Sequence, residues 1–162
     1  ESKAALGEAL LERFLVMDRE LLETVFARAQ ALSSDPLQQL LVAFGLIQEM
    51  FESLTEPHPG CLIAAFCYQE ELMTPKSLAS CADELRLWRE RIAAKLREAA
   101  KLHPPRIELD IDATADLLNT IVEGGFVMSK TPGAPLLIAG QIQQLRNYLA
   151  LVFGAKVPQS KA

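Results

Sequence analysis

Two small groups of residues carry side chains that could take part in catalysis. His58 and Cys61 stand three positions apart across Pro59-Gly60, and a base beside a thiol is the pairing that activates a cysteine nucleophile. A short turn gives no reason for the two side chains to align, and no third residue is evident that would orient the histidine. Asp110 and Asp112 resemble a carboxylate pair, but their position at the start of a predicted helix favours capping and stabilisation of the helix dipole. We therefore expect no catalytic residue and no enzymatic activity.

The residues that commonly bind metals or phosphates form no recognisable motif either. Cys61, Cys67 and Cys81 are odd in number and lie in helical patterns, and neither a CxxC pair nor a histidine at metal-ligand spacing accompanies them. No glycine-rich loop is present that could cradle a phosphate. The sequence thus predicts no metal and no cofactor. It also predicts reduced thiols packed in the core of a cytoplasmic protein.

The composition is that of an ordinary globular domain. The chain has 162 residues, of which 50% are hydrophobic and 23% are charged, enough for one domain with a substantial core. No apolar run approaches the roughly 20 residues that cross a bilayer, and no signal peptide is visible. The chain begins with Glu1 rather than Met, which is compatible with a piece of a longer protein. The net charge is −5 without a cluster of Lys or Arg, so we expect this chain to bind neither nucleic acid nor a membrane by itself.

Helical periodicity covers nearly the whole chain, and no strand alternation is visible. Asp35 and Pro36 offer an N-cap and a first helical position, and Gly154 follows the last periodic segment. The helices are expected at about 2–32, 36–54, 61–73, 77–101, 110–130 and 135–153, with 107–109 as an extended linker. The predicted fold class is all-α, a bundle of about six helices. It forms one domain over residues 1–156, followed by a flexible tail over residues 157–162.

The last two helices carry apolar residues at alternating steps of three and four, the spacing of a helix that packs along another helix. Gly124 and Gly125 lie inside the first of the two, where each costs roughly 1 kcal/mol relative to alanine. Such a cost is understandable where another backbone comes close. We therefore predict an interface with a second copy of the chain, formed by Leu118, Ile121, Gly125, Met128, Ile138, Ile142, Leu145, Leu149 and Val152.

Several segments share their order and spacing with a known family. They are Ser2–Leu6 with Leu10–Phe14, Pro59–Phe66, Glu123–Gly125 and Gln144–Leu149. Together they resemble the C-terminal region of TetR/AcrR-type transcriptional regulators, and the similarity spans essentially the entire chain. In that family the first segment joins the DNA-binding head to the core, the second begins the middle helix, and the last two belong to the dimer bundle. The family's helix-turn-helix is absent from this chain.

The resemblance implies a domain that binds an effector and forms a homodimer through a four-helix bundle of its last two helices. A small apolar or aromatic effector would bind inside the core, and operator DNA would be bound only through the missing N-terminal head. The commoner mode in the family is repression that the ligand releases. Lys3 matches a position that often touches a DNA phosphate in the family, although a solvated lysine near a helix start explains it equally well.

The family's pocket lies between the first and the central helices, which directs attention to the aromatic and apolar residues there. The expected ligand-binding residues are Phe14, Met17, Phe44, Ile47, Phe51, Phe66, Trp88, Asn119, Glu123 and Phe126, with Gln48, His58 and Tyr68 as further polar candidates. An aromatic at helical spacing is, however, core filler more often than pocket wall. A carboxylate at Glu123 could meet a cationic ligand, be solvated or act across the dimer.

A second hypothesis from another class is a helical homodimeric interaction module without any small-molecule ligand. A cavity bounded by Phe44, Phe66 and Trp88 would favour effector sensing, and a solid core at that place would favour the interaction module.

Overall fold

The computed structural model describes residues 3–56, 58–69, 74–130 and 137–158, and of Lys3 and Ala4 only the backbone. Six α-helices make up this part of the chain, and no strand occurs within it, which confirms the all-α prediction. The helices are α1 (Lys3–Leu32), α2 (Pro36–Glu52), α3 (Leu62–Tyr68), α4 (Pro75–Leu102), α5 (Ile111–Ser129) and α6 (Leu137–Val152).

Short polar residues fix where three of the helices begin. The Asp35 carboxylate accepts a hydrogen bond from the Gln38 amide (3.0 Å) and precedes Pro36, as predicted. Asp110 caps α5 in the same way through the Ala113 amide (3.0 Å). Helix α4 begins at Pro75 rather than at the predicted residue 77, because the hydroxyls of Thr74 and Ser77 cap one another's backbone amides. The helix predicted over 61–73 is observed as α3, which ends at Tyr68; residues 70–73 lie outside the described part.

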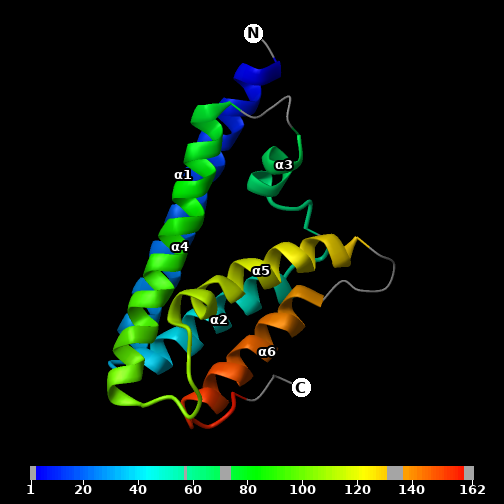
Figure 1. The fold of residues 1–162 in the computed structure, drawn as a ribbon. Helices are drawn as coiled ribbons and strands as arrows, with labels where there is room; N and C mark the ends of the chain where they lie inside the picture. The colour runs from blue at the N-terminus through cyan, green and yellow to red at the C-terminus, as the bar shows by residue number, and fades with distance from the viewer. Residues whose placement is uncertain (1–2, 57, 70–73, 131–136, 159–162) are drawn as a thin grey trace.

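The two longest helices, α1 and α4, lie side by side and run in the same direction (Figure 1). Ion pairs at matching heights hold them together: Lys76 with Glu12, Arg19 with Glu84 and Arg91 with Glu23. The shorter helices α2, α5 and α6 cross this pair, and α3 lies near its N-terminal end (Figure 1). Helix α6 packs against α2 and α5, and α4 packs against α1, α2 and α5.

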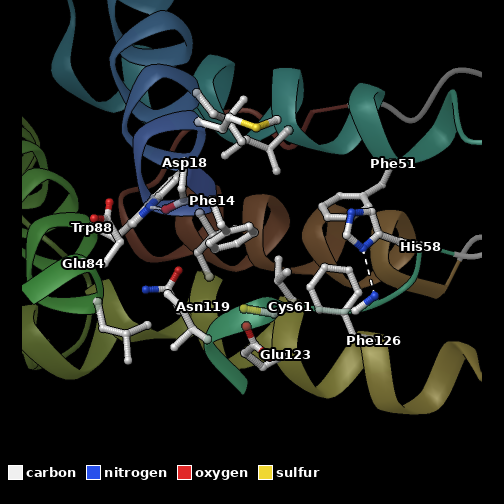
Figure 2. Close-up of a pocket in the computed structure, with 18 of the residues that line it drawn as sticks. Phe14, Asp18, Phe51, His58, Cys61, Glu84, Trp88, Asn119, Glu123 and Phe126 are labelled. Carbon is white, nitrogen blue, oxygen red and sulfur yellow. Dashed lines mark hydrogen bonds between the residues drawn. The ribbon is translucent and has the colours of Figure 1, made fainter. Parts of the chain in front are cut away.

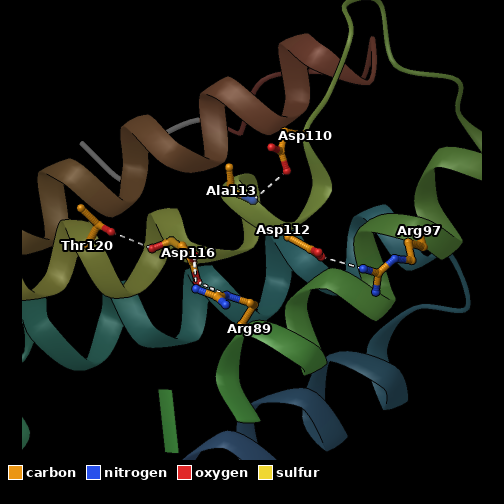
Figure 3. A network of polar contacts seen from close by, with 7 residues as sticks. All are labelled: Arg89, Arg97, Asp110, Asp112, Ala113, Asp116 and Thr120. Atoms are coloured by element: carbon orange, nitrogen blue, oxygen red, sulfur yellow. Dashed lines mark hydrogen bonds and ion pairs between the residues drawn. The ribbon is translucent and has the colours of Figure 1, made fainter. Parts of the chain in front are cut away.

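Exposed ion pairs also join α4 to α5. Arg89 binds both carboxylate oxygens of Asp116, at 2.6 and 2.7 Å, and Arg97 binds Asp112 at 2.6 Å (Figure 3). Asp112 therefore pairs with an arginine of the neighbouring helix, whereas Asp110 acts as the helix cap. Each residue of the apparent carboxylate pair thus has a structural contact of its own.

The main core is built by five helices, and a smaller cluster lies where α1, α3 and the start of α4 meet. Leu22, Leu40, Leu96 and Ile142 are completely buried at the centre of the main core. The smaller cluster consists of Leu11, Leu15, Ile63, Phe66 and Cys81. The space between the two clusters is where the pocket described below lies.

The predicted dimer interface is wrong for most of its residues, since this chain's own core buries them. The residues at most 5% exposed are Leu118, Ile138, Ile142, Leu145, Leu149 and Val152. Gly125 is also buried, because Ile138 of α6 lies against it. Ile121 is half-buried against the same core, and of the predicted set only Met128 is well exposed. The stepping pattern correctly indicated helix-on-helix packing, but the partner helices belong to the same chain.

A different set of residues faces outward from the last two helices. We call it the outer face of α5 and α6; it comprises Gly124, Val127, Met128, Gly140, Gln144, Tyr148 and Leu151. Of these, Gly124 and Val127 also border a hollow between α3 and α5. Val127 and Leu151 are well exposed on this face, at 67% and 59%. On α6 the exposed residues Gly140, Gln144, Tyr148 and Leu151 follow one another at steps of four, four and three, on another side of the helix from the buried stripe.

Candidate functional site

A pocket of about 340 Å³ lies between α1, α2, α4 and α5, closed at one side by the segment that precedes α3. Figure 2 shows side chains from all of these elements converging on it. Its walls are mostly apolar, from residues including Phe14, Met17, Leu21, Ile47, Met50, Leu118 and Val122. The volume falls in the range of sites that hold small organic molecules.

Most of the predicted ligand residues line this pocket. They are Phe14, Met17, Ile47, Phe51, Trp88, Asn119, Glu123 and Phe126. Phe44 and Phe66 do not: Phe44 belongs to the main core and Phe66 to the smaller cluster. Helical spacing cannot separate an aromatic that fills a core from one that borders a hollow, because both lie on the inward face of a helix.

A cluster of three aromatic side chains forms one end of the pocket. The rings of Phe51 and Phe126 meet edge to face with centroids 5.8 Å apart, and His58 stacks on Phe126 at 4.7 Å (Figure 2). Burial lowers the pKa of His58, and the positive charge of Lys130 lowers it further. The imidazole is therefore neutral at pH 7 and accepts a hydrogen bond from the Gly60 amide (3.2 Å).

Two carboxyl groups lie at the opposite end. Asp18 of α1 accepts a hydrogen bond from the indole of Trp88 at 2.6 Å, and Glu84 of α4 accepts one from Arg19 at 2.6 Å. Figure 2 shows Asp18, Glu84 and Trp88 together at this end. Burial raises the pKa of Asp18 against the opposing effects of Trp88 and Arg19. Burial likewise raises the pKa of Glu84, although the Arg19 guanidinium opposes it and the nearby Asp18 charge adds to it. The two acids thus sit in an environment that disfavours their charge.

Glu84 has one carboxylate oxygen without a hydrogen-bond donor. The residue is completely buried, and its Oε1 atom has no partner while Oε2 binds Arg19. A buried acceptor left unpaired costs about 1–3 kcal/mol, and more when it is charged. Sequence reasoning missed Asp18 and Glu84 because both stand among charged residues on long helices, where an acid is ordinarily solvated.

Between the two ends, Cys61 and Glu123 face one another across the pocket wall (Figure 2). Burial, followed by interaction with the Glu123 carboxylate, raises the pKa of the Cys61 thiol to about 12. Such a thiol is protonated at neutral pH and lacks the thiolate that nucleophilic attack requires. Asn119 adds the only amide side chain among the described residues of the wall.

The remaining predicted positions lie elsewhere. Gln48 hydrogen-bonds Arg146 (2.9 Å) and Glu52 (2.7 Å) and so belongs to a polar network outside the pocket. Tyr68 is 84% exposed, and the side chain of Lys3 lies outside the described residues. The expectation of core-packed thiols holds for Cys81, whereas Cys67 is exposed.

A second hollow of about 630 Å³ adjoins the pocket along α3 and α5. The two share Gly60, Cys61, Ile63, Leu85, Glu123 and Phe126 as wall residues. The pocket and the wider hollow are therefore neighbours that share the wall formed by these residues, on the side of the pocket that faces α3.

Three further observations concern the membrane, metal ions and similarity to known proteins. Within the described ranges, no helix has the length and apolarity needed to cross a bilayer. Across the same residues, no three His, Cys, Asp or Glu side chains cluster closely enough to hold a metal ion. Comparison with protein-family models, with curated proteins and with solved structures finds no match to this chain.

Proposed function

We propose that this chain is the effector-binding and dimerisation domain of a TetR-type transcriptional regulator. A small molecule would bind in the pocket between α1, α2, α4 and α5 and change the affinity of the whole protein for DNA through a helix-turn-helix head. The single observation that carries the proposal is the pocket itself, an apolar hollow of about 340 Å³ with a few convergent polar groups. The resemblance of the segments around Pro59, Glu123 and Gln144 adds the functional class.

The pocket is placed where binding can act on α1. Both acids at its end take part in contacts between α1 and α4: Asp18 bonds Trp88, and Glu84 bonds Arg19. A ligand that competes for these side chains alters the packing of α1 along α4. The ligand can shift that equilibrium only by the difference of its affinities for the two arrangements. In a regulator of this class α1 joins the DNA-binding head, so a tilt of α1 changes the separation of two heads that must fit half-sites about 34 Å apart.

Dimerisation is proposed through the outer face of α5 and α6, in place of the stripe that the sequence suggested. Val127 and Leu151 are exposed there, and Gly124 and Gly140 leave room for close approach of a partner helix. Two copies related by a twofold axis would bring this face onto itself and form a four-helix bundle.

A titration with the neutral, environment-sensitive dye Nile red tests whether the pocket binds ligand. Trp88 is the sole tryptophan of the chain and lies in the wall, so dye bound in the pocket quenches Trp88 fluorescence by energy transfer. Val122→Phe fills the pocket, and we expect it to weaken dye binding at least about tenfold, which corresponds to roughly 1.4 kcal/mol. Val16→Phe places the same ring on exposed α1 surface and serves as the matched control.

Saturable quenching that Val122→Phe abolishes and Val16→Phe leaves intact would support the effector-binding domain. Dye binding that both variants leave unchanged would contradict it. A protein that dimerises but binds no dye would fit the alternative function, a helical interaction module, which the exposed outer face of α5 and α6 also suits.

A further inference from the structure

We propose that the pocket selects organic cations that carry an N–H group, such as a protonated amine or amidine on an apolar body, and that the paired carboxyls of Asp18 and Glu84 bind this group. The inference deepens the proposed function and rests on it, since it names the chemical class of the effector. The observation that carries it is the buried carboxylate oxygen of Glu84 that lacks a donor.

The unpaired oxygen of Glu84 is able to accept a hydrogen bond from a ligand in the pocket. Glu84 lines the pocket and is completely buried, so bulk water does not reach it. Asp18 lies next to it but is itself a carboxyl and can satisfy it only by sharing a proton. The single N–H donor of the Trp88 side chain is hydrogen-bonded to Asp18, and Arg19 donates to the other carboxylate oxygen of Glu84. An ammonium or amidinium entering the pocket supplies both a donor and the opposite charge.

The charges of the wall point the same way. The acidic wall residues are Asp18, Glu84 and Glu123, and no lysine or arginine is among the residues that line the pocket in the described part of the chain. Arg19 pairs with Glu84 from outside and is half exposed, so solvent screens its charge. The other titratable wall groups, His58 and Cys61, are neutral at pH 7. Among the described wall residues an anionic ligand would meet carboxylates and no lysine or arginine, while the charges of Arg19 and Lys130 act on Glu84 and His58 from outside the wall.

The rest of the wall suits the apolar body of such a ligand. Trp88 stands beside the carboxyls, and Phe14 follows toward the middle of the pocket (Figure 2). Phe51, His58 and Phe126 close the far end with a stacked aromatic group. Aromatic faces attract cations, so the end near Trp88 favours the charged head, and the far end favours an aromatic or aliphatic tail.

The test compares three ligands of one shape and different charge. Biphenylmethylamine is cationic at pH 7, biphenylmethanol is neutral, and biphenylcarboxylate is anionic. Isothermal titration of the whole chain measures the dissociation constant of each. We expect the amine to bind at least about tenfold more tightly than the alcohol, the effect of one hydrogen bond to a charged group. The carboxylate is expected to bind more weakly than the alcohol.

Two variants assign the preference to the acid pair. Glu84→Gln keeps the shape and removes the charge, and Asp18→Asn does the same while leaving an oxygen for the Trp88 indole. Each should reduce the amine-to-alcohol preference at least about fivefold with little change in alcohol affinity, since only the cation loses its counter-charge. Glu90→Gln on the exposed face of the same helix is the matched control and should leave all three affinities unchanged.

The outcomes separate this inference from the proposed function. Amine preference that both pocket variants diminish and Glu90→Gln does not would support it. Equal binding of amine and alcohol, or a preference that survives both pocket variants, would overturn it while leaving a ligand-binding pocket in place. Absence of binding by all three ligands would overturn both the inference and the effector-binding function.

Discussion

The two adjacent glycines of α5 provide a sharp test of how the last two helices pack. A Cβ atom added at Gly125 would stand 2.6 Å from Cγ1 of Ile138 and 3.5 Å from its Cα, whereas one added at Gly124 meets nothing within 4 Å. The same substitution, glycine to alanine, is therefore expected to crowd Ile138 at position 125 and to meet open space at position 124.

The expected magnitudes follow from two effects. Alanine gains roughly 1 kcal/mol over glycine in a helix interior at either position, because it limits the unfolded chain and favours helix. Gly124→Ala should therefore raise the free energy of unfolding by up to about 1 kcal/mol. At Gly125 the added methyl must displace Ile138, which is only 5% exposed, and overpacking of this kind costs about 1–3 kcal/mol. The propensity gain cancels in the difference, so Gly125→Ala should be about 1–3 kcal/mol less stable than Gly124→Ala.

Urea unfolding followed by circular dichroism measures both free energies, with sedimentation velocity run alongside to detect any change of oligomeric state. A double-mutant cycle adds the identity of the neighbour: on an Ile138→Ala background the penalty of Gly125→Ala should shrink, because the contacted Cγ1 atom is gone. Equal stabilisation by both alanines would refute the packing of α5 on α6 described above. If Gly125→Ala dissociated the dimer while leaving the free energy of unfolding unchanged, Gly125 would lie in a subunit interface, as the sequence had suggested.

Three further predictions concern the outer face, the thiols and the buried acids. Leu151→Glu should raise the dimer dissociation constant at least about tenfold in sedimentation equilibrium with unchanged circular dichroism, and an unaltered dimer would exclude the outer face of α5 and α6. Ellman's reagent should modify exposed Cys67 quickly and Cys61 slowly, because burial raises the Cys61 pKa to about 12; a fast phase that survives Cys67→Ser would contradict this. Since the pKa values of Asp18 and Glu84 are raised in the folded state, both acids favour folding most below about pH 4 and less as the pH rises through the folded values. Glu84→Gln should therefore gain stability over the parent protein in urea unfolding as the pH rises from 4 to 7, and a constant difference would argue against burial of that charge.

The helices themselves could be read from the sequence because their signals are local. Asp35-Pro36 and Asp110 mark helix starts by short-range hydrogen bonds, and Gly154 ends α6 with a positive φ of 69° that glycine adopts easily. Most of the predicted ligand residues border the pocket, since the same inward face of each helix lines the core and the hollow.

Which helix packs against which is a long-range property, and there the sequence was insufficient. The stripe through Ile138, Ile142 and Leu149 has the same spacing whether its partner is α2 or a second subunit. The polar end of the pocket was missed for a related reason. Asp18 and Glu84 are 66 residues apart in sequence and meet only because α1 and α4 lie parallel, which no local pattern in either helix expresses.

The central claim is that small molecules bind in the pocket between α1, α2, α4 and α5. Two-dimensional NMR of the isotope-labelled chain, titrated with biphenylmethylamine, tests it most directly because every amide and the Trp88 indole report separately. We predict saturable shifts concentrated at Asp18, Glu84, Trp88, Asn119 and Phe126, with the Trp88 indole signal among the largest. Shifts confined to the outer face of α5 and α6, or no saturable shift at any of these pocket residues, would contradict the account.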